Sequence, residues 1–286
     1  MIPSRLPVPL VFILAAAISA AAQIPTISVK TEEVRVDVLV TDRGKPVHGL
    51  KPMDFEVFDN GIPRKIIFAT QEHISLNIVL VLDMSSSVAG QRLSHLRRAG
   101  RLLLDKLQED EHAALVTFSH TVSIKSRLTT DLVRLKAQLE EVQPVGNTSV
   151  IDASYAGLMI AESRPGRPLL IIFSDGLDTS SWLTSEAVLD TAKRSDAVVY
   201  AVSSGQHPKT TFLRDLTQFT GGALFEIEWT RNLAQVFINI LEEFRQRYLV
   251  TYWPAGALSE GWHRLEVRVK GRNLTVKARP GFFIGR

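Results

Sequence analysis

The sequence predicts an α/β protein with a doubly wound, mostly parallel sheet and helices on both faces, inserted between N- and C-terminal β segments. Two observations lead to this fold class. In the middle of the chain, continuous apolar runs such as Leu76–Leu82 and Leu169–Phe173 alternate with helical segments. Such runs are typical of parallel strands that are covered on both faces. Toward the ends, Val34–Val40 and His263–Val269 alternate apolar with polar residues, as half-buried strands do.

The central α/β domain is expected to span residues 73–245. Its elements follow one another with the short connections of a doubly wound sheet. After the strand Leu76–Leu82, a helix is expected around a group of leucines between Leu93 and Leu107. Further strands are expected at Ala113–Phe118, Val122–Ile124, Leu169–Phe173, Ala197–Val202 and Ala223–Ile227, and further helices at Asp131–Val142, Val150–Ala161, Ser185–Arg194, Thr211–Phe219 and Leu233–Arg245.

The outer segments, residues 23–72 and 246–286, are predicted to pair with each other in one small β domain. Each segment contains strand patterns, but each is too short to bury a stable core alone. A tight turn at Asp59-Asn60-Gly61 is expected to join two strands of the first segment. The expected strands are Val34–Val40, Phe55–Phe58, Lys65–Phe68, Tyr248–Trp253, His263–Val269 and Leu274–Ala278.

Residues 1–22 are predicted to form an export signal. Arg5 supplies a positive charge, Leu10–Ala22 is apolar, and Ala20-Ala21-Ala22 forms a small-residue cleavage site. An uncleaved membrane anchor is the alternative, although a spanning helix needs about 20 apolar residues and this stretch is shorter. No later segment has the length and hydrophobicity of a membrane span. A periplasmic or secreted protein is therefore expected.

Charge and cysteine content narrow the class of protein. The chain has 33 basic and 30 acidic residues, so its formal net charge is +3. This near-neutral balance gives no support to a general role in nucleic-acid binding. The chain has no cysteine, which excludes disulfides, thiolate metal sites and cysteine nucleophiles. Export without cysteine is more typical of a bacterial envelope protein than of an animal secreted protein.

Oxygen-bearing side chains gather in three loops that follow elements of the predicted sheet. Asp83-Met84-Ser85-Ser86-Ser87 follows the first central strand, Gly146-Asn147-Thr148-Ser149 precedes a helix, and Ser174-Asp175-Gly176 follows a later strand. In parallel α/β sheets, ligands bind at the carboxyl ends of the strands. The loops are therefore expected to meet at one edge of the sheet.

This set of side chains suits a hard divalent cation. Mg²⁺ prefers about six oxygen ligands and keeps several waters. A closed Ca²⁺ loop would instead crowd its carboxylates into one segment. Any one of these loops alone is more often a turn or a helix N-cap, because serine and aspartate are common at both. The three loops together predict a site for Mg²⁺ or Mn²⁺.

The three loops resemble the metal-ion-dependent adhesion site of von Willebrand factor A-type (VWFA) domains, in the same order and with similar separation. The resemblance covers about Ser75 to Arg245 and implies a VWFA-like fold. It implies that the serines bind the ion directly and that the other ligands bind directly or through water. A carboxylate of a partner protein would complete the shell. The implied ligands are Asp83, Ser85, Ser87, Thr148 and Asp175.

The flanking β segments resemble a bacterial subgroup described as VWFA-related and known mainly from Acidobacteria. That subgroup has no assigned activity. The segments that show the resemblance are Val36–Asp42, Gly44–Leu50, Asp54–Gly61 and Ala278–Phe283.

The expected function is metal-dependent capture of a partner protein with an exposed acidic residue, without catalysis. One alternative is a structural envelope protein whose metal site is vestigial. The other is a Mg²⁺-dependent phosphoryl-transfer enzyme with an aspartyl nucleophile. Such enzymes usually need a second carboxylate two residues after the nucleophile, and Ser85 stands there. They also use a lysine near the phosphate, and none lies close in sequence to the three loops.

Several other polar residues are expected to have supporting roles. Asp152 and Asp178 lie near the loops and are interpreted as capping residues or as residues that surround the ligands. His120, at a strand edge, could line the metal face. The segment Arg164–Pro168 is interpreted as a stiff connector before a strand. A solvated helix face is expected for Arg92, Arg97, Arg98 and Arg101.

Overall fold

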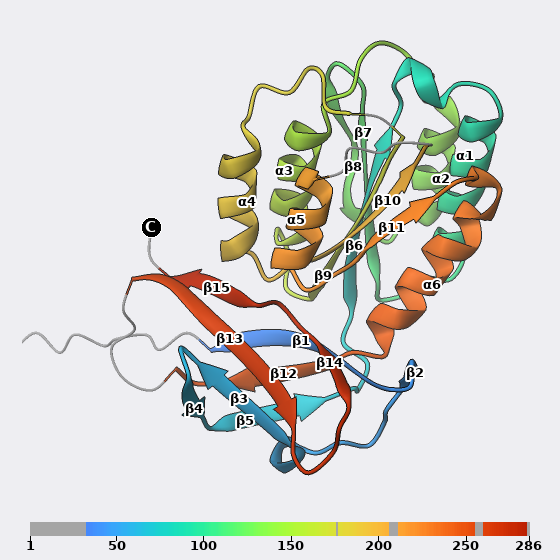
Figure 1. Cartoon of the computed structure of the whole chain (residues 1–286). Helices are drawn as coiled ribbons and strands as arrows, with labels where there is room; N and C mark the ends of the chain where they lie inside the picture. Colours follow the sequence, from blue (N-terminus) through green and yellow to red (C-terminus); the bar gives the residue numbers. More distant parts are fainter. Residues whose placement is uncertain (1–32, 176, 206–210, 255–259, 285–286) are drawn as a thin grey trace, which may run out of the picture. The chain divides into compact units, whose positions relative to one another are not determined.

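The structure is a computed structural model that describes residues 33–284 except 176, 206–210 and 255–259 (Figure 1). The expected export signal, residues 1–22, therefore lies outside the described residues. Among the described residues, no helix combines the length and apolar character needed to cross a membrane.

The α/β domain is built on a six-stranded sheet in the order β11-β10-β9-β6-β7-β8. All neighbouring pairs are parallel except β7 and β8. Every residue of β6 and β9 is buried, as their continuous apolar runs predict. The strands are β6 (Leu76–Asp83), β7 (His112–Phe118), β8 (Val122–Thr129), β9 (Arg167–Ser174), β10 (Val198–Ser204) and β11 (Leu224–Ile227).

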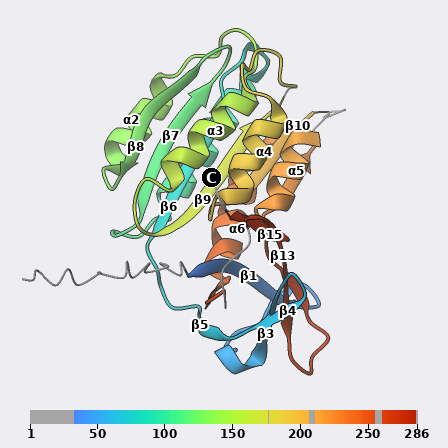
Figure 2. The ribbon, with the colours of Figure 1, turned by 90° about the vertical axis from the view of Figure 1, so that its left-hand side faces the viewer.

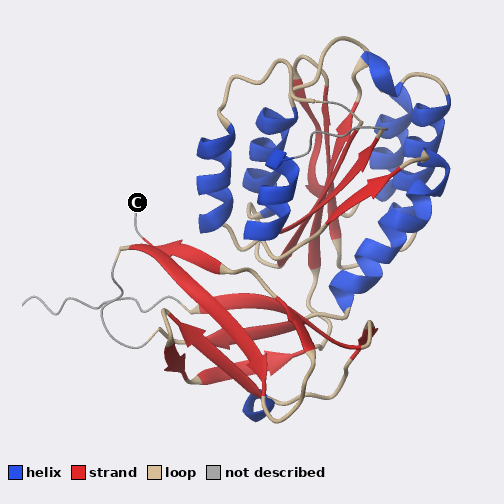
Figure 3. Ribbon diagram, in the orientation of Figure 1, coloured by secondary structure: helices blue, strands red, loops and turns tan. Residues whose placement is uncertain are grey.

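Helices cover both faces of this sheet (Figure 3). Successive residues of β6 point to opposite faces: Ile78, Leu80 and Leu82 join one apolar core, whereas Val79 and Val81 join the other. The first core is covered by α1 (Gln91–Leu104), α2 (Leu132–Glu141) and α6 (Leu233–Arg245), and the second by α3 (Val150–Ala161), α4 (Ser185–Arg194) and α5 (Thr211–Phe219). The predicted doubly wound, mostly parallel fold is confirmed.

The outer segments form a β domain of two sheets around a shared apolar core. Strand β1 of the first segment pairs with β12 of the last, and β3 pairs with β13. This confirms the predicted pairing of the two segments. The strands are β1 (Val34–Asp42), β2 (Lys45–Pro46), β3 (Phe55–Asp59), β4 (Ile62–Arg64), β5 (Ile66–Thr70), β12 (Tyr248–Tyr252), β13 (Gly261–Val269), β14 (Thr275–Lys277) and β15 (Gly281–Ile284).

Two details of the β domain differ from the prediction. The expected strand Lys65–Phe68 begins at Ile66 instead, and the short strand before it, β4, belongs to the other sheet. The chain crosses between the two sheets at Lys65, which separates β4 from β5. The final strand, Gly281–Ile284, was not predicted, because four residues are too few for a periodic pattern to stand out.

The β domain lies below the α/β domain, next to the amino ends of the sheet strands (Figure 2). Buried arginines make contacts between the two domains. Arg167, the first residue of β9, donates from Nε to Asp37 Oδ1 of β1 at 3.0 Å. Its side chain is only 4% exposed. The interpretation of Arg164–Pro168 as a plain connector is therefore wrong for Arg167, whose charge is paired across the domain boundary. Arg247, just after α6, is fully buried and donates to Tyr200 Oη and to the Gly221 carbonyl, each at 2.8 Å.

Candidate metal centre

The carboxyl ends of the two central strands bring the first and third loops together. Strands β6 and β9 are parallel neighbours in register, with Leu82 opposite Phe173. The residues that follow therefore lie side by side, and Ser174 Oγ donates to Asp83 Oδ2 at 2.7 Å. Sequence reasoning missed Ser174 as a residue of the site. The parallel alignment of the two strands was the signal that could have found it.

A chain of hydrogen bonds links four of the five predicted ligands. The Ser85 amide donates to Asp83 Oδ1 at 2.8 Å, which curls the loop back on its own first residue. The Ser85 and Ser87 hydroxyl oxygens are 2.9 Å apart. Ser87 Oγ then donates to Asp175 Oδ1 at 2.6 Å. The first and third loops thus bring two carboxylates and two hydroxyls together.

The second loop is fastened to the first by backbone contacts. The Ser86 amide donates to the Gly146 carbonyl at 3.1 Å, and the Val145 amide donates to the Met84 carbonyl at 2.8 Å. Gly146 has a φ of 74°, and a Cβ there would lie 2.4 Å from His120 Nδ1, so glycine is required. His120 therefore packs against the loop that leads to Thr148.

Thr148 is 6% exposed, and its backbone is held in place. Its amide donates to Thr179 Oγ1 at 3.1 Å, and its carbonyl accepts from the Thr179 amide at 2.8 Å. Within the described part of the chain, the Thr148 hydroxyl has no hydrogen-bond partner. It is the one predicted ligand outside the hydrogen-bonded chain that links the other four.

Burial sets the electrostatics of the site. Desolvation raises the pKa of the Asp83 carboxyl above its ordinary value, and the nearby Asp175 carboxylate adds to that rise. Hydrogen bonds from Ser85 and Ser174 act in the opposite direction. A buried carboxylate next to a second one is stabilised by a cation placed between or beside them.

These residues fit a hard divalent cation. The described residues contain no cluster of three or more histidine, aspartate or glutamate side chains that could hold a metal. A metal at these loops would thus depend on hydroxyl oxygens together with Asp83 and Asp175. Such an all-oxygen, partly neutral donor set suits Mg²⁺ or Mn²⁺ better than a soft metal.

Arg92 is a second residue of the site that sequence reasoning missed. Its Nη1 lies 2.7 Å from Asp175 Oδ2 and 3.1 Å from the Ser87 carbonyl oxygen. The Asp175 side chain is fully buried, whereas the Arg92 side chain is 47% exposed. Arg92 lies on the exposed side of α1, as predicted, but its guanidinium also pairs with Asp175. The predicted solvated face is wrong for Arg97, which is half-buried and donates to the Val142 carbonyl at 2.7 Å.

The acidic residues around the loops have structural partners, as interpreted from the sequence. Asp178 accepts from the Ile151 amide in the first turn of α3 at 3.3 Å. Asp152 accepts from the Trp182 and Leu183 amides at 3.0 and 2.9 Å. These contacts fasten the loop after β9 to the helix that follows Thr148.

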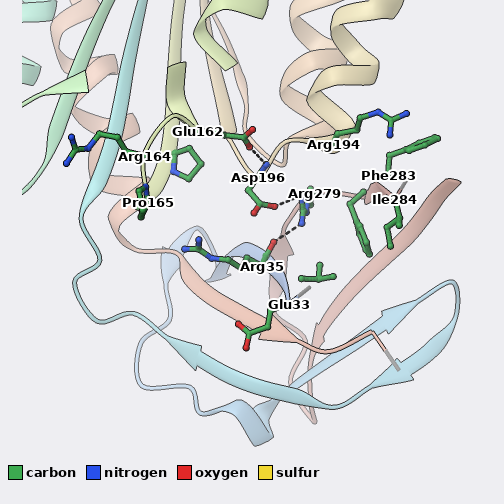
Figure 4. Close-up of a pocket in the computed structure, with 14 residues that line it drawn as sticks. Glu33, Arg35, Glu162, Arg164, Pro165, Arg194, Asp196, Arg279, Phe283 and Ile284 are labelled. Carbon is green, nitrogen blue, oxygen red and sulfur yellow. Dashed lines mark hydrogen bonds and ion pairs between the residues drawn. The ribbon is translucent and has the colours of Figure 1, made fainter. Parts of the chain in front are cut away.

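A separate cavity of about 550 Å³ lies at the boundary between the two domains (Figure 4). Arg279 and Glu162, two of its charged lining residues, are held by contacts with neighbouring segments. Arg279 donates to the Ser195 and Arg35 carbonyls at 3.0 and 2.8 Å, and pairs with Asp196 at 3.1 Å. Glu162 accepts from the Asp196 amide at 2.5 Å. These contacts join the domains, so the loops at the other edge of the sheet remain the candidate functional site.

Comparison with known proteins places the fold and the loops in one family. A model of the von Willebrand factor type A domain matches residues 77–237. Inter-alpha-trypsin inhibitor heavy chain H2 of Mus musculus is 26% identical over 158 residues, which cover 51% of this chain and 17% of that protein. The chain thus spans less than a fifth of that relative.

Two solved structures have the same fold. A von Willebrand factor type A protein from Catenulispora acidiphila gives a TM-score of 0.57 at 12% identity, covering 86% of this chain and 76% of that one. Proximal thread matrix protein 1 from the mussel byssus, with zinc in its MIDAS motif, gives 0.55 at 15% identity, covering 64% and 48%. Because the family model spans more than half of the 286 residues and every element of the α/β fold is present, this chain belongs to the von Willebrand factor type A domain family.

Proposed function

We propose that this protein is an exported binding module that captures an acidic group of a partner protein through a Mg²⁺ or Mn²⁺ ion. The observation that supports this best is the hydrogen-bonded chain from Asp83 through Ser85 and Ser87 to Asp175, with the Thr148 hydroxyl presented from a separate loop. Asp83, Ser85, Ser87, Thr148 and Asp175 are the proposed ligands.

The donor set favours binding to an anionic partner. The two carboxylates contribute at most two negative charges, and the three hydroxyls are neutral. A divalent ion held by them keeps a demand for a further oxygen ligand, which a carboxylate from outside can supply. A site of this kind is selective for acidic groups without performing chemistry on them.

The burial of Asp83 argues against the phosphoryl-transfer alternative. An aspartyl nucleophile must reach the phosphorus of its substrate, but Asp83 is 0% exposed and both of its carboxylate oxygens accept hydrogen bonds. The basic side chain next to the site is an arginine that pairs with Asp175. The alternative of a vestigial metal site predicts no measurable metal binding.

Metal use is supported by one structural neighbour, which has zinc in its MIDAS motif. For this chain, export rests on the signal-like residues 1–22. Membership of the VWFA-related bacterial subgroup is part of the same proposal and rests on the flanking β segments.

The direct test is calorimetric titration of the protein with Mn²⁺ and Mg²⁺, alongside Asp83→Asn. Asparagine keeps the shape of the side chain but removes the charge. We expect the variant to lose metal binding and to stay folded, because Asp83 is the last residue of β6 and is not part of either apolar core. Asp190→Asn is the matched control, since its carboxylate is exposed and, among the described residues, pairs only with Lys193. Equal metal binding by Asp83→Asn and the unmodified protein would remove the assignment.

The partner can then be sought in envelope extract. Capture by the protein in Mg²⁺ should disappear in EDTA and with Asp83→Asn, and should remain with Asp190→Asn. Hydrolysis of a simple phosphoester that depends on Asp83 would instead show that the protein is an enzyme.

A further inference from the structure

Arg92 contacts two of the proposed metal ligands at once. Its Nη1 donates to Asp175 Oδ2 at 2.7 Å and to the Ser87 carbonyl at 3.1 Å. The other carboxylate oxygen, Asp175 Oδ1, accepts from the Ser87 hydroxyl. Both oxygens of the Asp175 carboxylate thus accept hydrogen bonds from the protein itself. A metal at this site would compete with these donors for the same oxygens.

The position of Arg92 in its helix is electrostatically unfavourable. It is the second residue of α1 (Gln91–Leu104), and the first turn of this helix has no acidic residue. The N-terminus of a helix has a partial positive charge, which disfavours a cation there and favours an anion. A partner near the helix end must offset this, and Asp175 is that partner. The placement therefore serves the loops and not the stability of the helix.

The two charges of the pair differ in their exposure. The Asp175 side chain is 0% exposed and the Arg92 side chain is 47% exposed. The carboxylate cannot turn to water without disturbing the loop, whereas the guanidinium can leave by rotating about its own side chain. A buried carboxylate without a cation has an unfavourable free energy. The Asp175 carboxylate therefore binds firmly whichever cation is present.

From these observations we infer that Arg92 is a built-in cation that neutralises Asp175 in the metal-free protein and is displaced when the divalent ion binds. The inference rests on the proposed function, because the displacing cation is the proposed metal. A divalent ion beside Asp175 repels the guanidinium, since both are positive and close together. Metal binding therefore includes the cost of breaking the Arg92–Asp175 pair, and the arginine lowers the affinity for metal.

The test compares Mn²⁺ affinity, measured by calorimetry, among the unmodified protein, Arg92→Gln, Arg92→Lys and Arg98→Gln. Arg98 is the matched control, because it is an exposed arginine of the same helix without a partner among the described residues. We expect Arg92→Gln to bind Mn²⁺ about tenfold more tightly, a size typical of coupling between two sites. Arg92→Lys should lie between the two, because it keeps the charge without the planar fork. Arg98→Gln should match the unmodified protein.

A second measurement follows the metal-free protein. In EDTA, Arg92→Gln should melt at a lower temperature than the unmodified protein, because Asp175 loses its cation. Saturating Mg²⁺ should remove that difference. In an Asp175→Asn background, Arg92→Gln should change neither melting nor affinity, because no carboxylate remains for the arginine to neutralise.

The possible outcomes separate this inference from the proposed function. If the unmodified protein and Arg92→Gln bind Mn²⁺ with equal affinity, the displacement is refuted while the metal site stands. If neither protein binds Mn²⁺, the proposed function fails, and the inference fails with it. If Arg92→Gln binds more weakly, Arg92 supports the metal and the inference is overturned. An equal gain in Arg98→Gln would show a general effect of charge on α1, which also overturns it.

Discussion

Replacement of Arg247 by methionine should weaken the attachment between the two domains. Arg247 is 0% exposed. Its Nη2 donates to Tyr200 Oη and to the Gly221 carbonyl at 2.8 Å, and lies 3.4 Å from Glu243 Oε1. Methionine fills much of the same space but offers no donor, so the Tyr200 oxygen and the Gly221 carbonyl lose this donor while they stay buried. Glu243 loses one of its partners.

The size of the effect follows from these contacts. Removal of one partner of a buried charged network costs about 3–5 kcal/mol. We expect the lower end, about 3 kcal/mol, because Tyr200 still donates to Glu243 at 2.5 Å and Lys277 still pairs with Glu243. A loss of 1 kcal/mol lowers the melting temperature of a domain of this size by about 2–4 °C, so the variant should melt about 6–12 °C lower.

The assay is urea unfolding followed by circular dichroism, with thermal melting in parallel. Arg214→Met is the control, since the Arg214 side chain is 60% exposed and its pair with Glu226 lies at the surface. Exposed pairs contribute about 0–1 kcal/mol. If Arg247→Met lies within about 1 kcal/mol of the unmodified protein, the buried network does not hold the domains together, and the reasoning is refuted.

Three further predictions concern the β domain and the loops. Deletion of residues 246–286 should leave β1 and β3 without their partners β12 and β13, and limited proteolysis should then cut the N-terminal β segment. Burial alone would raise the pKa of Glu243, but the Tyr200 hydrogen bond and Lys277 hold that pKa below its usual value. Its contribution to stability is therefore present above pH 4.5 and is lost at lower pH, so Glu243→Gln should flatten the acid limb of the stability profile. Asp152→Ala should remove about 1 kcal/mol of local stability from the Trp182 amide, measurable as faster hydrogen exchange.

Each of these predictions has an opposing result. A truncated chain whose N-terminal β segment resists protease would show that this segment folds without its partner strands. If the loss of stability at low pH is the same in Glu243→Gln as in the unmodified protein, other groups cause the pH dependence. Unchanged exchange at Trp182 would mean that packing, and not the Asp152 carboxylate, orders the loop.

The fold could be predicted from the sequence because its strongest signals are local. The buried runs of β6 and β9 mark strands that are covered on both faces, whatever lies around them. The pairing of the two β segments followed from a size argument, since neither can bury a core alone. The loops at Asp83 and Asp175 were expected to be close, because parallel strands end at the same edge. The loop at Thr148, which lies between two helices, was expected beside them from the resemblance to VWFA domains.

The rest depends on contacts between residues that are distant along the chain. Nothing near Arg92 indicates Asp175, because 83 positions separate them and the pair forms only when the fold brings the first turn of α1 to the loop after β9. Arg167 is similar, since its partner Asp37 lies in the other domain, 130 positions away. Arg92 was expected on a solvated helix face, and Arg167 was interpreted as part of a stiff connector. Arg92 had one local signal, which is a basic side chain at the wrong end of a helix.

The insertion of the α/β domain has a mechanical consequence. Its two connections, from β5 into β6 and from α6 into β12, both leave at the amino edge of the sheet. Arg245 near the end of α6 pairs with Glu111 just before β7, which places that end of the helix there. Asp83 is at the far end of β6, so this one strand spans the domain from the connection to the proposed ion. A tensile load applied by a captured partner would therefore run lengthwise along β6 and be divided between two adjacent connections. Strands pulled in this direction must shear many hydrogen bonds at once, so the domain would resist extension best in the direction in which a partner at the ion pulls.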